Sequence, residues 1–285
     1  MILFRDRAAT ILFEVLDIIG KHKKFLLPLN ICPVVPDTFI KTGVQFKFVD
    51  INPVTLCMDE ELALKMIRDD STISGLLFVR TFGIEINPKS FYQRLKKLKP
   101  EIFIIDDQCL SMPIFDLDID NTYASLTLFS SGYSKYVDIG YGGYGFLRDD
   151  RFEGIFQDNT NDSDFLSYKR IITKKIPLIK EHKSKINAIY REEIPTGLHL
   201  GSAFESWRFS ILIDEKERLL KKIFQHKGLF ASSHYKPIDY KYTEHPMQNS
   251  NAQKISDKIV NFFNDFRFTE EKAAQCAQIV SHFSK

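Results

Sequence analysis

This chain of 285 residues has few cysteines and almost no net charge. Its four cysteines lie far apart and form no CxxC pair, which excludes a small disulfide-stapled domain and favours a reducing cytoplasm. The 39 basic and 37 acidic residues leave a net charge of +2, too small to bind nucleic acid through bulk charge. No apolar run approaches the roughly 20 residues of a membrane-spanning helix, and charges interrupt the first ten positions. We therefore expect neither a membrane anchor nor an export signal.

Several common catalytic motifs are also missing. The chain contains no phosphate-binding P-loop, no nucleophile elbow of the hydrolase type and no HExxH zinc motif. None of its seven histidines stands three or four residues from another histidine or a cysteine. Because metal ligands usually recur at such spacings, the sequence predicts no dedicated metal site.

The first 150 residues do contain an alternation of short β-rich apolar runs with segments of helical periodicity. Runs such as IFIID and SLTLF are apolar on both faces, which is typical of a parallel sheet covered by helices on each side. The pattern predicts a three-layer αβα domain with a mostly parallel sheet, whose ligands bind at the carboxyl ends of the strands. The predicted strands are 25–29, 45–49, 75–80, 102–106, 125–129 and 142–147, and the predicted helices lie over about 7–21, from about 59, and over 88–98.

The pattern changes after Asp150, where a polar loop leads into a lysine-rich helical stretch from Phe165 to Glu193. From Trp207 a smaller unit follows, with a strand, a charged helix, a second strand and two closing helices. We therefore predict a large α/β domain over residues 1–200 and a small C-terminal α/β subdomain over residues 201–285.

Two features at predicted strand ends can carry chemistry. In IIDDQC, Asp106 and Asp107 follow a buried strand, where a carboxylate needs a cation, a metal or a ligand nitrogen. Alternatively, these aspartates cap the next helix or face water. The second feature places Ser130 and Lys135 between a strand and the glycine-rich turn GYGGYG, although a lysine in such a position is often only solvated.

Together, the two features match what a pyridoxal phosphate site requires. The amine of Lys135 can form the Schiff base, a neighbouring aspartate can hold the proton on the pyridine nitrogen, and Ser130 supplies a hydroxyl. Once the substrate amine has displaced it, the lysine is free to move a proton between carbon atoms.

The order and spacing of these segments resemble the DegT/DnrJ/StrS family of pyridoxal-phosphate sugar aminotransferases, which have the aspartate-aminotransferase-like fold. The likeness covers most of residues 1–150 and returns from about 207 to 284. DDQCL, which runs from Asp106 to Leu110, aligns with the family's Glu-Asp-x-Ala-Gln/His stretch, and FSSGYSK matches its Phe-Ser-x-x-x-x-Lys. GYGG aligns with the family's Gly-Glu-Gly-Gly, and HYKP with its His-Tyr-x-Pro.

The resemblance implies a role for five residues at the cofactor. Lys135 is the catalytic lysine, Asp107 pairs with the pyridinium nitrogen, and Ser130 donates to the phosphate. Arg7 stands at the start of the helix that cups the phosphate, and Cys32 stands where an aromatic residue usually covers the ring.

Four positions depart from the family pattern. The Gln or His near the ring oxygen is Leu110, the ring cover is Cys32, and the glutamate of the glycine loop is Tyr141. The Gly-Ser/Thr of the first helix start aligns with Asp6 and Arg7. Arg7 can bind the phosphate directly, whereas Asp6 would repel it. The alternative is that Asp6 is an N-cap and Arg7 a solvated residue of the first turn.

The lysine at position 135 favours amino transfer, because family members that act as sugar dehydratases have a histidine there. The resemblance implies a nucleotide-linked keto sugar as substrate, glutamate as amino donor, and a role in making surface polysaccharide or a glycosylated metabolite. It also implies a cytoplasmic homodimer whose active sites lie at the subunit interface. Tyr141 and Arg80 are candidates for contacting the substrate.

Two other interpretations remain open. Because of the four departures, the chain can be a catalytically weak or inactive descendant that serves as a binding or partner module. A third interpretation is a binder of nucleotides or sugar phosphates that uses GYGGYG as a phosphate loop, although the dinucleotide fingerprint is missing.

Overall fold

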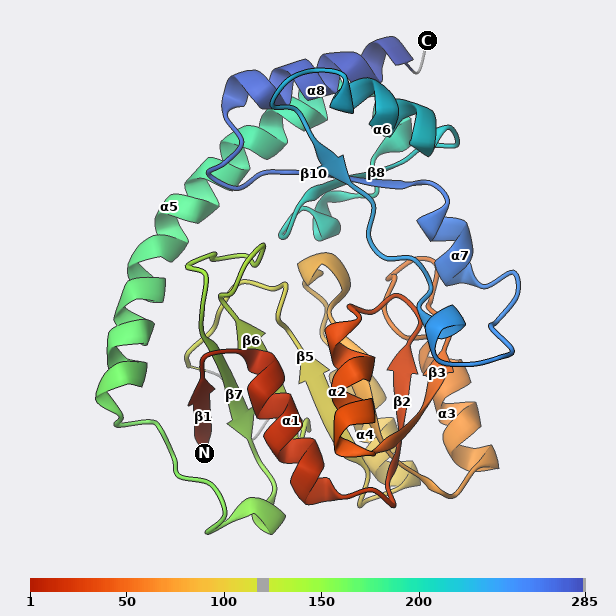
Figure 1. The fold of residues 1–285 in the computed structure, drawn as a ribbon, viewed down its shortest axis with the longest axis vertical. Coiled ribbons are helices and arrows are strands. Elements are labelled where there is room, and N and C mark those ends of the chain that lie inside the picture. Colours follow the sequence, from red (N-terminus) through yellow and green to blue (C-terminus); the bar gives the residue numbers. More distant parts are fainter. Residues whose placement is uncertain (117–122, 284–285) are drawn as a thin grey trace.

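The computed structural model describes residues 1–116 and 123–283, which form a larger and a smaller unit (Figure 1). The larger unit contains a seven-stranded sheet of β1 (Ile2–Arg5), β2 (Lys24–Pro28), β3 (Gln45–Val49), β4 (Ile73–Val79), β5 (Phe103–Asp107), β6 (Leu126–Ser130) and β7 (Gly143–Leu147). Their spatial order is β1-β7-β6-β5-β4-β2-β3. Strands β2 to β6 pair in parallel, and β7 pairs antiparallel with both β6 and β1. The prediction of a mostly parallel sheet is confirmed.

Helices cover both faces of this sheet. On one face lie α1 (Ala8–Ile19) and α2 (Val34–Thr42), and on the other lie α3 (Glu60–Asp69) and α4 (Lys89–Leu98). Successive residues of each strand point to opposite faces. In β5, for example, Ile105 packs in the cluster of α1 and α2, whereas Ile104 packs in the cluster of α3 and α4. The predicted αβα layering is confirmed.

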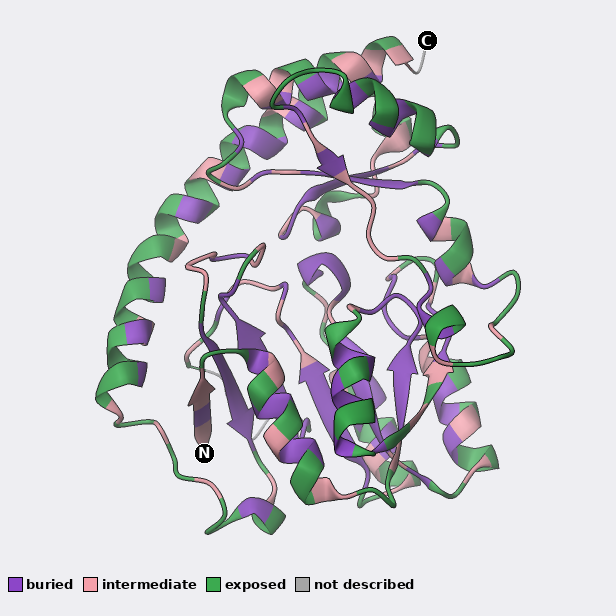
Figure 2. Ribbon diagram, viewed as in Figure 1, coloured by how far each residue is buried: buried purple, intermediate pink, exposed green. Residues whose placement is uncertain are grey.

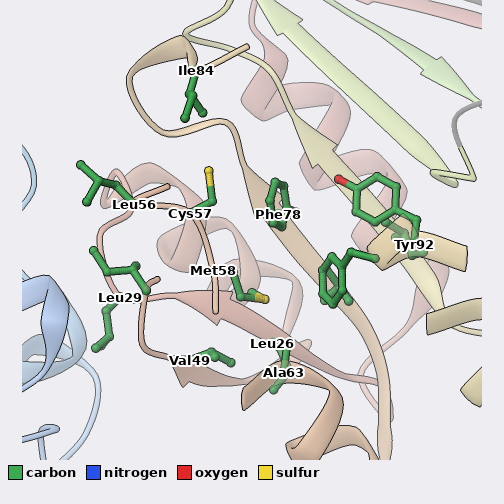
Figure 3. Packing of buried hydrophobic residues seen from close by; sticks show 14 of the residues in the cluster. Leu26, Leu29, Val49, Leu56, Cys57, Met58, Ala63, Phe78, Ile84 and Tyr92 are labelled. Carbon is green, nitrogen blue, oxygen red and sulfur yellow. The ribbon is translucent and has the colours of Figure 1, made fainter. Parts of the chain in front are cut away.

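The layer beneath α3 and α4 shows how apolar strands produce this arrangement. Leu26, Val49 and Phe78 come from three neighbouring strands and meet Ala63 of α3 and Tyr92 of α4 (Figure 3). Each of these five side chains is at most 1% exposed. Figure 2 shows buried residues along the central strands and the inner faces of the helices. Removal of this apolar surface from water is the main contribution to stability, at about 25 cal/mol per Å².

The smaller unit is built around a three-stranded antiparallel sheet in the order β8-β10-β9. Its elements are β8 (Phe209–Leu212), α6 (Lys216–Phe224), β9 (Ala231–Ser232), β10 (Ile259–Phe262) and α8 (Glu270–Phe283). The short helix α7 (Asn251–Ser256) packs on the larger unit instead, where Ala252 joins the core beside α3 and α4. The central strand β10 lies between the two closing helices, where no strand was predicted. Its apolar run IVNF is too short to separate from the helical patterns beside it, and its strand form depends on pairing with both neighbours.

A single long helix, α5 (Ser163–Glu193), runs from the larger unit to the smaller one (Figure 1). Near its start, Phe165 and Tyr168 pack against β6 and β7, whereas Ile186 and Tyr190 near its end belong to the core of the smaller unit. The helix therefore contributes side chains to the cores of both units. The predicted domain boundary at residue 200 stays a prediction. None of the helices described is at once long enough and apolar enough to cross a membrane.

Candidate active site

A cavity of about 190 Å³ opens at the carboxyl ends of the parallel strands, beside the first turns of α1 and α2. This edge is where open α/β sheets bind their ligands. All five residues predicted at the cofactor line the cavity. The complete lining is Arg7, Ala8, Ala9, Leu12, Cys32, Val34, Val35, Asp107, Cys109, Leu128, Ser130, Gly132, Tyr133 and Lys135.

The two adjacent aspartates point to opposite faces of β5. Asp107 lines the cavity, and its Oδ1 accepts a hydrogen bond from the Cys109 N–H at 2.9 Å. Asp106 is 2% exposed and forms two hydrogen bonds with Arg80, from Nε at 2.9 Å and from Nη2 at 2.8 Å. Gln108 donates a third bond to this carboxylate. The pleat of the strand therefore assigns Asp107 to the cavity and Asp106 to a buried ion pair.

Arg80 lines neither this cavity nor a second one that adjoins it at Lys135. Burial is the largest single influence and lowers its pKa, but the hydrogen bonds with Asp106 and the nearby negative charges, that of Asp106 first, together outweigh burial, so the pKa of Arg80 is raised. Tyr141, the other candidate for contacting the substrate, is 45% exposed and contacts the ring of Tyr168 instead of lining either cavity. The structure therefore brings neither residue to the site.

The first turn of α1 presents unsatisfied donors to the cavity. Arg7 is the N-cap residue, and no side chain caps the helix. No acceptor within the described residues takes the N–H of Ala8 or Ala9. A free helix start of this kind attracts anions through its N–H groups and its dipole. Asp6 is exposed and is not the cap, and its carbonyl oxygen accepts a hydrogen bond from the Gly142 N–H at 2.7 Å.

The approach of α1 to the sheet depends on a glycine. A Cβ atom at Gly143 would lie 2.0 Å from the Ala8 nitrogen and 2.5 Å from the Ala8 Cα. Because these are backbone atoms, no side-chain rotation can relieve the clash. Gly143 therefore allows the start of α1 to lie close to the sheet. Ser130 pairs with Gly143 in the register of β6 and β7, so the helix start also lies beside Ser130.

The loop that carries Lys135 is held by its own backbone. The Ser131 N–H donates to the Gly142 carbonyl at 2.9 Å, which closes the loop at its base. Inside it, the Asp138 carboxylate accepts the N–H groups of Ser134 at 2.9 Å and Gly140 at 3.1 Å. Lys135 is half-buried, and its ammonium makes no hydrogen bond or ion pair within the part of the chain described. The loop therefore presents the side-chain nitrogen of Lys135 to the cavity.

Two cysteines line the same cavity. Burial, together with the nearby charge of Asp107, raises the pKa of the Cys109 thiol well above its usual range, so this thiol is neutral at pH 7. Cys32 stands at the position where the family resemblance expects an aromatic ring. Among the described residues, no group of three or more His, Cys, Asp or Glu side chains is placed to hold a metal ion.

A second cavity, of about 500 Å³, adjoins the first and shares Cys32, Tyr133 and Lys135 with it. The smaller unit supplies its opposite wall, including Arg208 and Tyr235. Neither of these was predicted as a site residue. The family resemblance gave a signal for both, because RFSILI, which begins at Arg208, resembles the family's arginine-phenylalanine-led strand and HYKP resembles its His-Tyr-x-Pro segment.

Leu110, the residue in place of the family's Gln or His, lines this second cavity and not the first. Its side chain is 6% exposed and belongs to the apolar core beneath the site. It offers no hydrogen bond to a ligand. The polar contacts of the second cavity therefore come from other residues.

No family profile and no curated protein matches this sequence, but solved structures match it over nearly its whole length. A DegT/DnrJ/EryC1/StrS aminotransferase from Brucella abortus is 15% identical, with 99% of this chain and 85% of that chain covered and a TM-score of 0.71. The GDP-4-keto-6-deoxy-D-mannose-3-dehydratase of E. coli is also 15% identical, with coverages of 98% and 87% and a TM-score of 0.74. DesI, solved with its TDP-sugar product, is 13% identical, with coverages of 99% and 80% and a TM-score of 0.79. The chain has the fold of the DegT/DnrJ/EryC1/StrS sugar aminotransferases.

Proposed function

We propose that the protein is a pyridoxal-phosphate-dependent aminotransferase that acts on a nucleotide-linked keto sugar. The observation that carries the proposal is that Lys135, Asp107 and the free start of α1 line one cavity. These groups fit the cofactor, because its aldehyde needs an amine, its pyridine nitrogen a carboxylate, and its phosphate a set of N–H donors. The E. coli dehydratase of the same fold was solved with hydrated pyridoxal phosphate, and DesI with a TDP-sugar.

The residues at the two ends of the cavity would bind different parts of the cofactor, according to their charge. The N–H groups of Ala8 and Ala9, the Ser130 hydroxyl and the Arg7 guanidinium form the end that would hold the phosphate. At the other end, the bond from the Cys109 N–H fixes Oδ1 of Asp107 and leaves Oδ2 for the ring nitrogen. The neutral Cys109 thiol adds no charge at the ring, and the Cys32 side chain completes the lining.

The bound cofactor would supply an electron-accepting ring to the substrate carbon that loses its proton. Lys135 contributes the amine that holds the aldehyde and, once a substrate amine replaces it, the base that moves the proton between carbon atoms. Its loop, braced by Asp138, keeps the amine at the junction of the two cavities. Asp107 keeps the ring nitrogen protonated by presenting a fixed negative charge.

The finer parts of the proposal rest on the family resemblance. They are glutamate as amino donor, a role in making surface polysaccharide or a glycosylated metabolite, a cytoplasmic location and a homodimer. Sedimentation of the purified protein tests the dimer, and a strict monomer at working concentration would contradict it.

An absorbance spectrum tests the proposed activity. We expect the protein to become yellow with pyridoxal phosphate, and the band to disappear in Lys135→Ala but to persist in the matched exposed variant Lys221→Ala. Glutamate should then convert the band and release 2-oxoglutarate. A protein that stays colourless in excess cofactor would overturn the proposal.

A second candidate is a catalytically weak or inactive binding module with the same fold. The observation that favours it is the lining of the cavity, where Cys32 offers no aromatic cover for a ring and Leu110 no hydrogen bond. Glutamate-dependent conversion of bound cofactor at a rate above that of free cofactor would exclude it.

A further inference from the structure

A third cavity, of about 220 Å³, lies between α5, the loop of Lys135 and the short helix η5 (Ser202–Phe204). It shares no lining residue with the two cavities at Lys135. Its lining is almost entirely polar, because Ala203 is the one residue in it whose side chain has no polar group. A ligand of this cavity would therefore be held by hydrogen bonds and not by apolar contact.

Four hydroxyl groups of this cavity are free. They belong to Tyr136, Ser184, Ser202 and Ser206, and none of them makes a hydrogen bond with another residue in the described part of the chain. Ser184 and Ser202 are exposed at the rim, where water can reach them. Tyr136 is different, because it is only 6% exposed. A hydroxyl in such surroundings costs free energy unless it is hydrogen-bonded, so that of Tyr136 needs a partner inside the cavity.

The floor of the cavity is polar and already held in place. Lys183 Nζ donates to the Trp207 carbonyl at 2.8 Å and to Asn264 Oδ1 at 2.6 Å. The Asn187 amide donates to the Glu205 carbonyl at 3.2 Å and accepts a bond from Asn264 Nδ2 at 2.9 Å. These bonds fix the floor but use most of its hydrogen-bonding capacity. The bonds to a ligand would therefore come from the four free hydroxyls.

The charges of the lining oppose one another. Glu85 and Lys180 are both exposed at the mouth and have opposite signs. Further in, the Glu205 carboxylate pairs with Arg191, and burial lowers the pKa of Lys183 to about 7, so it is only partly charged at pH 7. A ligand of either sign gains little net attraction in such a cavity. Hydroxyl groups suit it better, because a hydroxyl both donates and accepts without carrying charge.

We propose that this cavity binds a neutral polyhydroxyl compound of the size of a monosaccharide. Its volume of about 220 Å³ equals that of about seven water molecules in the liquid, which is enough for one sugar ring. The hydroxyl of Tyr136 would hold the inner end of the ligand, and the serines would hold the outer end. Because the site lies outside both cavities at Lys135, the proposal goes beyond the proposed function and does not depend on it.

Bound ligand would connect two segments that already contact each other. Tyr136 follows Lys135 directly, and Ser206 precedes Trp207, whose indole N–H donates to the Ser134 carbonyl at 2.6 Å. A ligand bonded to both hydroxyls therefore spans the loop of Lys135 and the segment that leads into β8. Such a ligand binds the folded protein alone, so it should also raise the melting temperature.

Saturation-transfer NMR tests the proposal with D-glucose, D-galactose, D-mannose and L-rhamnose, and with glycine as a zwitterionic probe. We expect saturable binding of at least one of the sugars. Its Kd should rise about fivefold in Tyr136→Phe, the effect of one lost hydrogen bond, and stay unchanged in Tyr141→Phe, which removes an exposed hydroxyl outside the cavity.

A second variant, Ala203→Phe, fills the cavity without removing a polar group and should abolish binding. Both positions tolerate the change, because the Tyr136 hydroxyl has no partner among the described residues and Ala203 is exposed. Circular dichroism checks that the variants are folded.

Three outcomes would overturn the proposal. One is that none of the sugars binds saturably. Another is that a sugar binds but its Kd is the same in folded Tyr136→Phe and Ala203→Phe, which would place the sugar elsewhere. The third is saturable binding of glycine in place of every sugar. A linear rise of the melting temperature with sugar concentration in all variants is the general effect of an excluded osmolyte and counts as no binding.

Discussion

Asp106 and Asp107 are neighbours in the chain, but their side chains lie in different surroundings. The Asp106 carboxylate is buried and paired with Arg80, whose side chain is 12% exposed, whereas Asp107 faces the cavity of Lys135. Loss of one partner from a buried pair leaves the other charge uncompensated. Loss of a carboxylate that faces a cavity leaves no buried charge of the protein without its counter-ion.

We therefore expect Asp106→Asn and Asp107→Asn to differ in kind. Asp106→Asn should lower the free energy of unfolding by about 3 kcal/mol, as measured by urea denaturation. Asp107→Asn should lower it by less than about 1 kcal/mol but slow the glutamate half-reaction at least 100-fold, because an amide does not hold the proton on the pyridine nitrogen. Equal losses of stability in the two variants would contradict the assignment.

At the scale of elements, the site depends on where α1 begins. Its first turn reaches the cavity because β7 has no side chain at Gly143, where a Cβ would lie 2.0 Å from the Ala8 nitrogen. Gly145, two residues further along the strand, is a natural control. A Cβ there would have its closest contacts at 3.1 Å, with side-chain methyl groups of Leu126 and Leu128 that can adjust.

Gly143→Ala should displace the start of α1 and so reduce both stability and phosphate binding. We expect a loss of about 1–3 kcal/mol in unfolding free energy and at least a tenfold weaker affinity for pyridoxal phosphate, measured by absorbance titration. Gly145→Ala should change the affinity less than threefold. A Gly143→Ala protein that binds the cofactor like the unmodified protein would show that the helix start does not hold the phosphate.

At the scale of the whole molecule, Lys183 of α5 lies where the two units meet. It is 4% exposed, and its Nζ donates to the Trp207 carbonyl at 2.8 Å and to Asn264 Oδ1 at 2.6 Å. It also lies 5.1 Å from the ring centroid of Tyr136, next to Lys135 in the larger unit. Burial lowers the pKa of Lys183 to about 7.

This lysine should make stability rise with pH. In the unfolded chain its pKa returns to 10.5, so between pH 7 and 10.5 the unfolded state binds more protons than the folded state, and the free energy of unfolding increases with pH. From pH 7 to about 8.5, the expected rise is about 1.5 kcal/mol. The thiols do not disturb this pH window, because an exposed thiol has a pKa of 9.0, above the window. At higher pH they would oppose the trend. Burial raises the pKa of Cys57 and Cys276, so their thiols ionise in the unfolded chain before they ionise in the folded protein.

Urea denaturation at several pH values measures this rise. Lys183→Met should remove it, whereas Lys180→Met, an exposed position on the same helix, should retain it. An identical slope in the Lys183→Met protein would mean that other groups cause the pH dependence.

The sequence by itself determined most of the large unit and the main residues of the site. All six predicted strands are present within two residues of their predicted bounds. Most of them are runs that are apolar on both faces, which have few alternatives to a buried strand. Lys135, Asp107 and Ser130 follow such strands, and the carboxyl ends of parallel strands meet at one edge, so their convergence follows from the pattern.

Only the tertiary structure decided which charged side chains line a cavity and which are buried elsewhere. The sequence singled out Asp106 and Arg80 separately but did not show that they pair with each other. The burial of this pair and of Arg208 depends on elements far away in the chain. Arg80 pairs across two strands, and Arg208 lies against Phe263, which follows β10, a strand that forms only by pairing on both sides. Local patterns record the face of a strand, but the surroundings of a buried charge are set by long-range packing, which no local pattern contains.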